Sequence, residues 1–195
     1  MLNEFLKDIR VVLGSQSPRR KELLAKLGVD FEVIVKETAE TYDSDLEPED
    51  IVKNIAMGKI GGFGGREFED ALVITADTIV VCEGEVLGKP VDQQDAFRML
   101  HLLQGRSHEV WTGMAVSYGG RLYTFAEKTS VEFEPLNAAE INYYIAECHP
   151  YDKAGAYGIQ EWIGFVAVKR LIGSYENVVG LPTARLYKEL KKIIK

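Results

Sequence analysis

The sequence predicts an α/β fold in which helices flank a mixed, twisted sheet. Segments rich in β-branched residues alternate with helical patterns along the chain. Residues 71–81 are apolar almost throughout, as in a central strand buried on both faces. The β-type runs 108–118 and 121–134 meet at Gly119 and Gly120, which is a strong signal for an antiparallel hairpin. A buried central strand and a long hairpin in one chain favour a sheet with both parallel and antiparallel neighbours.

The first half of the chain is expected to begin with a strand and a helix. Residues 9–14 fit a strand, and Ser17 with Pro18 then supplies an N-cap and a favoured first helical residue. Gly28 follows the last apolar position and predicts the end of that helix. The other elements expected in this half are a strand at 31–35, an exposed acidic loop at 36–46 and a helix from Pro48 to about Lys59.

The second half is expected to contain three more helices and one more strand beyond the hairpin. Asp92 begins a helix that Gly105 stops. Asn137 and Glu140 fit a capping box for a helix that continues to about Cys148. The remaining expected elements are a turn at 83–84, a strand at 163–172 and a C-terminal helix at 182–194.

Length and composition indicate one globular domain over residues 1–195. Hydrophobic residues make up 46% and charged residues 27% of the chain, which is ordinary for a soluble protein with its own core. The net charge of −7 argues against a nucleic-acid partner, because such proteins usually present a basic face. Two cysteines, Cys82 and Cys148, without a CxxC pair exclude a disulfide scaffold and a cysteine-based zinc site. No apolar run is long enough to span a bilayer and no signal peptide is evident, so we expect a cytosolic protein without a membrane partner.

A candidate anion site lies at the first strand-to-helix turn, residues 14–20. The amides and the partial positive charge of a helix N-terminus attract phosphate groups. Ser15 and Ser17 can donate hydroxyl hydrogen bonds, and Arg19 or Arg20 can bind phosphate oxygens through two parallel bonds. The alternative is a simple Ser-Pro helix cap followed by solvated arginines.

Asp77 places a carboxylate inside the apolar strand. Burying a lone ionised carboxylate is costly, so this side chain should meet a cation, a metal or several hydrogen-bond donors. Near the end of a strand it could hold Mg²⁺ or take a proton from water. The alternative is a structural aspartate that accepts hydrogen bonds from backbone amides.

Two glycine-containing segments carry further polar candidates. Lys89 lies between Gly88 and Pro90, where the spacing excludes a P-loop, and a solvated loop lysine is the alternative to a ligand-binding one. In residues 151–160, glycines allow a ligand to approach the backbone closely. Gln160 ends this segment and offers both a donor and an acceptor, as recognition of a base edge requires.

Six segments, taken in order, resemble a single family. They are 15–24 (Ser-Gln-Ser-Pro-Arg-Arg-Lys-Glu-Leu-Leu), 76–80 (Ala-Asp-Thr-Ile-Val), 88–90 (Gly-Lys-Pro), 105–110 (Gly-Arg-Ser-His-Glu-Val), 152–160 (Asp-Lys-Ala-Gly-Ala-Tyr-Gly-Ile-Gln) and 179–182 (Val-Gly-Leu-Pro). Together they closely resemble the Maf family, the septum-formation-associated nucleoside triphosphate pyrophosphatases, over nearly the whole chain.

The resemblance implies a fold, a reaction and a cofactor. The fold is a mixed α/β structure with two lobes around a cleft, similar to the inosine triphosphate pyrophosphatases. The reaction cleaves a nucleoside triphosphate between its α and β phosphates and yields a monophosphate and pyrophosphate. The cofactor is a divalent metal cation, Mg²⁺ or a similar ion such as Mn²⁺, and family members are often homodimers.

The resemblance also assigns residues to roles. Asp77 matches the catalytic acidic residue, which accepts a proton. Asp77 and Glu40 match metal-binding positions, and the other acids of the 36–46 loop stay alternatives to Glu40. The residues that match the polar and basic positions lining the phosphates are Ser15, Arg19, Arg20, Lys59 and Lys89.

Three positions bear on the choice of base. Arg19, Thr78 and Gln160 match the branch of the family that acts on dTTP and UTP, whereas the branch acting on 7-methyl-GTP resembles Trp, Gln and Glu there. We therefore expect a pyrophosphatase for dTTP and UTP, with modified pyrimidine triphosphates as further candidates. The alternatives are the same chemistry on 7-methyl-GTP or other purine triphosphates, and a nucleotide-binding regulator of cell division without catalysis.

The chain departs from the family pattern at a few positions. Gly14 stands where alanine is usual, and we expect this change to be tolerated. Lys59 ends a helix that is less rich in alanine than is common. Glu161 and Trp162 follow Gln160 where small residues are common.

Overall fold

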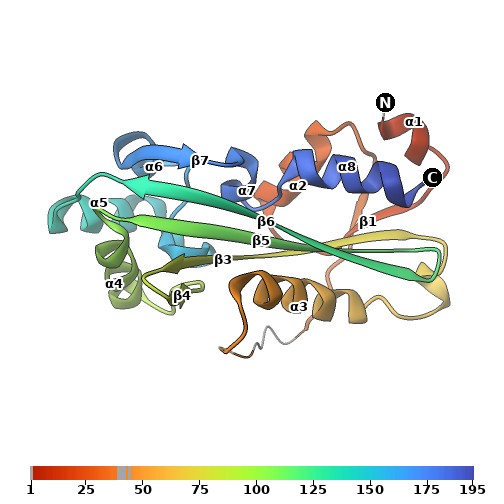
Figure 1. Ribbon diagram of the computed structural model, residues 1–195, viewed down its shortest axis with the longest axis horizontal. Coiled ribbons are helices and arrows are strands. Elements are labelled where there is room, and N and C mark those ends of the chain that lie inside the picture. The colour runs from red at the N-terminus through yellow and green to blue at the C-terminus, as the bar shows by residue number, and fades with distance from the viewer. Residues whose placement is uncertain (1, 39–42, 44) are drawn as a thin grey trace. The chain divides into compact units, whose positions relative to one another are not determined.

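The structure, a computed structural model, describes residues 2–38, 43 and 45–195, whose strands form one mixed sheet (Figure 1). The strand order is β2-β1-β3-β5-β6-β7, and β4 pairs with β3. Strand β1 runs parallel to β2 and β3, whereas β4 is antiparallel to β3 and β7 is antiparallel to β6. The mixed α/β sheet expected from the sequence is therefore confirmed. The strands are β1 (Val11–Leu13), β2 (Glu32–Val33), β3 (Leu72–Cys82), β4 (Glu85–Leu87), β5 (Ser107–Tyr118), β6 (Arg121–Phe133) and β7 (Val168–Ile172).

Helices occupy most of the connections between these strands. Three single 3₁₀ turns, at Arg66–Phe68, Pro150–Asp152 and Ala154–Ala156, add to them in the described chain. None of the helices in the described ranges is long and apolar enough to cross a membrane. The α-helices are α1 (Leu2–Leu6), α2 (Pro18–Lys26), α3 (Pro48–Gly61), α4 (Gln93–Leu103), α5 (Ala138–Cys148), α6 (Trp162–Val166), α7 (Tyr175–Val179) and α8 (Thr183–Ile193).

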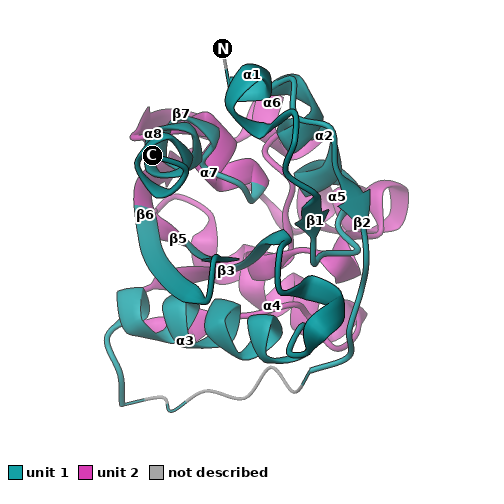
Figure 2. Cartoon of the chain, turned by 90° about the vertical axis from the view of Figure 1, so that its right-hand side faces the viewer, with its two compact units in different colours: residues 1–77, 112–127, 180–195 teal, residues 78–111, 128–179 magenta. Residues whose placement is uncertain are grey.

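The chain divides into two compact units (Figure 2). The first unit comprises residues 1–77, 112–127 and 180–195, and the second unit comprises residues 78–111 and 128–179. One boundary falls inside β3, directly after Asp77. The expectation of one domain over residues 1–195 stays a prediction.

In the first unit, strand β1 is completely buried between its two parallel neighbours. Helix α3 packs directly on strand β5, because a Cβ at Gly113 would lie 2.3 Å from the backbone carbonyl group of Val52. Only glycine at this position allows so close an approach. A small apolar cluster around Phe63 and Phe68 covers Val12 and Val73.

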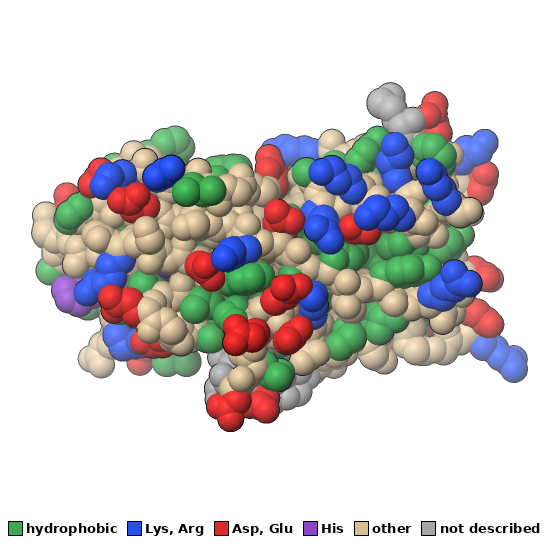
Figure 3. All heavy atoms as spheres, in the orientation of Figure 1, with side chains coloured by type: hydrophobic (Ala, Val, Ile, Leu, Met, Phe, Trp, Pro, Cys, Tyr) green, Lys and Arg blue, Asp and Glu red, His purple; other side chains and the backbone are tan. Residues whose placement is uncertain are grey.

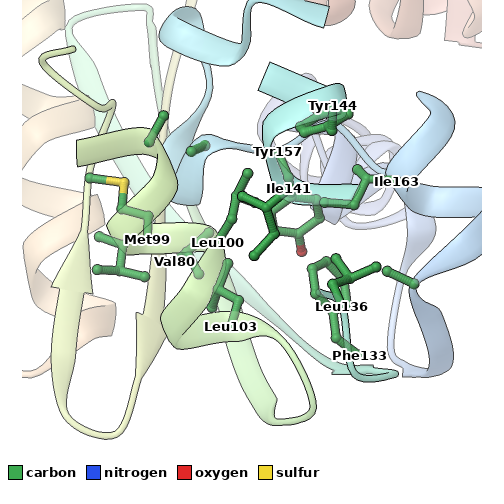
Figure 4. Close-up of a cluster of buried hydrophobic side chains, with 14 of the residues drawn as sticks. Val80, Met99, Leu100, Leu103, Phe133, Leu136, Ile141, Tyr144, Tyr157 and Ile163 are labelled. Carbon is green, nitrogen blue, oxygen red and sulfur yellow. The ribbon is translucent and has the colours of Figure 1, made fainter. Parts of the chain in front are cut away.

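In the second unit, helices α4 and α5 pack together over a larger apolar core (Figure 4). Tyr144, Phe133, Leu100 and Leu103 are among its fully or almost fully buried side chains. Burial of such side chains stabilises a fold by roughly 25 cal/mol per Å² of apolar area removed from water. This core fixes α5 and the segment that follows it.

Basic side chains gather over α8 on one face of the molecule (Figure 3). The helix carries Arg185, Lys188, Lys191 and Lys192. Arg185 and Lys192 both form ion pairs with Glu189, at 3.0 Å each. Part of this positive charge is therefore balanced within the helix itself.

The helix ends follow the capping signals in the sequence. The Ser17 side chain accepts a hydrogen bond from the amide of Arg20 at the start of α2, and Asn137 and Glu140 form the complete capping box of α5. The hairpin turn between β5 and β6 has φ of 56° at Gly119 and 71° at Gly120, a conformation that favours glycine.

The expected strand at 163–172 is wrong in its first half. Residues Trp162–Val166 form helix α6, and β7 begins only at Val168. Ile163 and Ala167 lie four residues apart and are both buried, so helical spacing prevails over the β-branched composition. A Cβ at Gly164 would lie 1.7 Å from the Ile159 carbonyl oxygen, so this tight corner requires glycine. The short helices α1 and α7 were not predicted.

Candidate functional site

The turn between β1 and α2 is organised by its own serine hydroxyls. The Ser15 Oγ is buried and accepts hydrogen bonds from the Ser17 amide and from Arg20 Nη1, both at 3.3 Å. The Ser17 Oγ accepts from the Arg20 amide at 3.4 Å as the N-cap of α2. The strand-to-helix turn expected from the sequence is thus present, with the amides of the helix N-terminus at its end.

Arg20 ties this turn to two distant parts of the first unit. Its Nη1 donates to the Ala76 carbonyl oxygen at 2.8 Å, and its Nε donates to the Gly180 carbonyl oxygen at 2.9 Å. The guanidinium group therefore lies beside the residue that precedes Asp77. Arg19 lies next to it in the first turn of α2 and is partly exposed.

Asp77 meets a cation, as the cost of burying a carboxylate requires. Lys59 Nζ lies 2.7 Å from Asp77 Oδ1 and 3.4 Å from the Ala76 carbonyl oxygen. The two side chains are only 14% and 12% exposed, so the ion pair is largely shielded from solvent. Lys59 comes from the last turn of α3, and the structure places it directly against the acid.

The position of α3 relative to β3 is fixed by a second contact. Thr75 Oγ1 donates a hydrogen bond of 2.7 Å to the Ala56 carbonyl oxygen, one turn before Lys59. Gly14, at the end of β1, packs against the same region. A Cβ at Gly14 would lie 2.8 Å from the Thr75 methyl group and 2.9 Å from the Phe63 ring, so glycine fits here without displacing either side chain.

The other candidates lie in the second unit or outside the described residues. Thr78 is partly exposed, and Lys89 and Gln160 are exposed. The turn that carries Lys89 is held at both ends: the Gly88 carbonyl oxygen accepts from the Gly155 amide at 3.0 Å, and the Val91 amide donates to Asp95 Oδ2 at 3.1 Å. Glu40 lies outside the described residues.

A family profile described as a Maf-like protein matches residues 10–193. The chain belongs to the Maf family. The match covers the β1–α2 turn, the Lys59–Asp77 pair and the segment that ends at Gln160.

Curated Maf relatives match over nearly their full length. A protein of Porphyromonas gingivalis is 46% identical over 189 residues, covering 95% of both chains. One of Bacteroides fragilis is 48% identical over 185 residues, covering 94% of this chain and 96% of the relative. One of Flavobacterium johnsoniae is 41% identical over 194 residues and covers both chains fully. Each of these relatives is named dTTP/UTP pyrophosphatase.

One solved structure similar to this chain is that of the Staphylococcus aureus Ham1 protein. It has a TM-score of 0.47 and 15% identity, and covers 64% of this chain and 71% of that one. The assignment to the Maf family rests on the profile match over residues 10–193.

The described site candidates of this Maf protein are found in both units. In the first unit the structure connects Ser15, Arg20, Lys59 and Asp77 through direct contacts or the shared Ala76 carbonyl group. Sequence reasoning missed the Gly180 carbonyl as a partner of Arg20, because the two residues are 160 positions apart. The roles of these residues in binding and catalysis stay predictions.

Proposed function

We propose that this Maf protein hydrolyses dTTP and UTP to the monophosphate and pyrophosphate. The observation that carries the proposal is the shielded Lys59–Asp77 ion pair, which lies beside Arg20 and the β1–α2 turn. The chain is also 41% to 48% identical to relatives that are named for this activity. A pure nucleotide binder has no need of an acid that activates water.

The basic residues would hold the triphosphate. Arg19, Arg20 and the amides at the start of α2 offer cationic and hydrogen-bonding groups to phosphate oxygens. In the second unit, Lys89 projects from a turn whose backbone is held on both sides. Negative charge grows on the pyrophosphate as it leaves, so these groups stabilise the transition state more than the bound substrate.

Asp77 would act as the general base. One carboxylate oxygen is held by Lys59 at 2.7 Å, which fixes the orientation of the group. The carboxylate takes a proton from a water molecule as the water oxygen attacks the α phosphorus. The new bond joins that oxygen to the α phosphorus, the bond between the α phosphorus and the bridging oxygen breaks, and pyrophosphate departs with the bonding electrons.

A divalent cation fits the donor set of this site when the substrate supplies part of it. Among residues 2–38, 43 and 45–195, no three His, Cys, Asp or Glu side chains group in the way a closed metal site requires. Mg²⁺ is commonly held by one or two carboxylates together with substrate phosphates and water. We propose that Asp77 and Glu40 supply the carboxylates and that the ion, Mg²⁺ or Mn²⁺, neutralises phosphate charge when bound.

The preference for pyrimidines would come from Arg19, Thr78 and Gln160. Gln160 is exposed and its amide can donate to and accept from a thymine or uracil edge.

The expectations of a homodimer, a cytosolic location and no nucleic-acid or membrane partner follow from the sequence and the family resemblance, and they too are proposals. Sedimentation of the purified chain tests the dimer.

Pyrophosphate release from the purified protein tests the proposed function. The assay uses dTTP, UTP, CTP, GTP, 7-methyl-GTP and ITP, with Mg²⁺ and with a chelator. We expect metal-dependent cleavage of dTTP and UTP, and a loss of about 10²–10⁴-fold in kcat in Asp77→Asn. Asp70→Asn, at an exposed aspartate just before β3, is the matched control and should retain full activity.

Three outcomes would count against parts of this proposal. Preferred cleavage of a purine triphosphate would keep the chemistry and overturn the base assignment. Full activity of Asp77→Asn would remove Asp77 from the mechanism. Nucleotide binding without any cleavage would favour the regulator of cell division.

A further inference from the structure

Gln160 lies in a closed turn of four residues. The Glu161 amide donates to the Gly158 carbonyl oxygen at 3.0 Å, so residues 158–161 form a hydrogen-bonded β-turn with Gln160 as its third residue. Ile159, the second residue, is buried, whereas Gln160 is exposed. The turn therefore anchors itself with one side chain and presents the next one outwards.

Tyr144 holds both ends of this turn with a single hydroxyl group. The Gly158 amide donates to the Tyr144 hydroxyl at 2.9 Å, and that hydroxyl donates to Glu161 Oε2. Tyr144 projects from α5 and is fully buried in the core of the second unit (Figure 4). A fixed point in the core thus sets the position of the residues on either side of Ile159 and Gln160.

Lys153 binds the second carboxylate oxygen of Glu161. Its side chain is only 8% exposed, and Nζ lies 3.1 Å from Glu161 Oε1 and 2.7 Å from Asp152 Oδ1. A Cβ at Gly158 would lie 2.9 Å from Glu161 Cδ and 3.1 Å from Lys153 Cε, so the turn closes tightly around these groups. Both oxygens of Glu161 are consequently engaged, one by a cation and one by a phenol.

We propose that Glu161 is a positioning residue, which fixes the turn that carries Gln160 and thereby sets the affinity and base preference of the nucleotide site. The inference rests on the proposed function, because it assigns Gln160 to the base. Within the described part of the chain, the Glu161 carboxylate contacts Tyr144 and Lys153, so it acts through the turn that carries Gln160.

The protonation state of Tyr144 supports this role. Burial raises the pKa of the phenol well above its ordinary value, and the hydrogen bond to Glu161 raises it further. The hydroxyl therefore keeps its proton and remains a donor to Glu161. A hydrogen bond to a charged acceptor is stronger than one between neutral groups, so loss of the carboxylate should loosen the turn.

The test compares variants of the full chain that remove the carboxylate in two steps. Glu161→Ala removes both contacts, and Glu161→Gln retains an acceptor for Tyr144 but not the charge. Lys153 stays paired with Asp152 in both, which avoids an isolated buried cation. Tyr144→Phe is a second route to the same effect. Glu147→Gln and Tyr143→Phe, at exposed positions of α5, are the matched controls.

Kinetics and binding are measured together with the thermal midpoint Tm. For dTTP and UTP we expect KM to rise about tenfold in Glu161→Ala, the equivalent of one charge-assisted hydrogen bond. The rise should be smaller in Glu161→Gln, and kcat should change little in both. The preference for dTTP over GTP should fall in parallel. Binding of the non-hydrolysable α,β-imido analogue of dTTP should weaken by the same factor as KM rises.

The outcomes separate this inference from the proposed function. If the wild-type protein binds the analogue but cleaves no triphosphate, the proposed function is wrong. The affinities of the variants for the analogue then still test the positioning role of Glu161. Unchanged KM, analogue affinity and base preference in folded Glu161→Ala and Tyr144→Phe would overturn the positioning role. A lower Tm without those changes would make Glu161 a merely structural residue and would also overturn it. A wild-type protein that binds no nucleotide overturns both.

Discussion

Lys59 and Asp77 form an ion pair that is largely shielded from solvent. An aspartate in an apolar strand must find a cation, a metal or donors, and this requirement is visible in the sequence. The identity of the partner is not, because Lys59 is 18 residues away and reaches Asp77 only after α3 has packed. The family resemblance named both residues as parts of the site, and the structure shows that they are in contact.

The strength of this pair can be measured with a double-mutant cycle. We expect Lys59→Met to reduce the free energy of unfolding by about 3 kcal/mol, because it leaves a shielded carboxylate without its cation. Asp77→Asn combined with Lys59→Met should be less destabilised than Lys59→Met alone, since no charge is left behind. Urea unfolding of the wild type, both single variants and the double variant gives the coupling energy. Purely additive costs would show that the pair contributes nothing to stability.

At the scale of elements, local signals were good predictors of where helices begin. Ser17, Asp92 and Asn137 all cap helices as expected, because a cap depends only on residues within one turn. The strand predicted at 163–172 is present only from Val168 onwards. The first half was wrong because its β-branched residues favour a strand, while burial of Ile163 and Ala167 by the rest of the unit selects a helix. The contacts that hold the Gln160 turn could not be predicted from the local sequence either, since Tyr144 and Lys153 approach the turn from other elements.

The packing of β1 against its neighbours gives a prediction at this scale. Gly14→Ala would place a methyl group 2.8 Å from Thr75 and 2.9 Å from Phe63, so we expect this substitution to destabilise the chain. Overpacking of this kind costs about 1–3 kcal/mol. Phe63→Leu in the same chain should recover part of the loss by making room. Chemical denaturation of the single and double variants measures the coupling, and equal costs of Gly14→Ala with and without Phe63→Leu would refute it.

At the scale of the whole molecule, the stability of the fold depends on pH through His108, which is buried in the core of the second unit. His108 Nε2 lies 2.8 Å from the Tyr157 hydroxyl, and its ring packs edge-on against Phe133. Its Nδ1 has no hydrogen-bond partner within the described chain. Burial lowers the pKa of His108 from 6.5 to about 4, so the ring stays neutral in the folded protein at neutral pH.

The sign of the resulting pH dependence follows from proton uptake. Between pH 6.5 and about 4 the unfolded chain protonates His108 and the folded protein does not. The unfolded state therefore binds more protons, and acidification through this window favours it, by at most about 3 kcal/mol in total. Above pH 6.5 both states are neutral at this residue, and its contribution to the pH dependence vanishes.

The test compares the unfolding free energies of His108→Gln and the wild type across this pH window. The difference between them separates the contribution of His108 from that of the carboxylates. We expect the variant to be less stable at neutral pH, because the Tyr157 contact is altered, and to lose less stability than the wild type on acidification. His101→Gln, at an exposed position of α4, is the control and should keep the wild-type slope. Identical slopes for the wild type and His108→Gln would mean that His108 accepts a proton in the folded state, and that the core around Tyr157 opens to water before the protein unfolds.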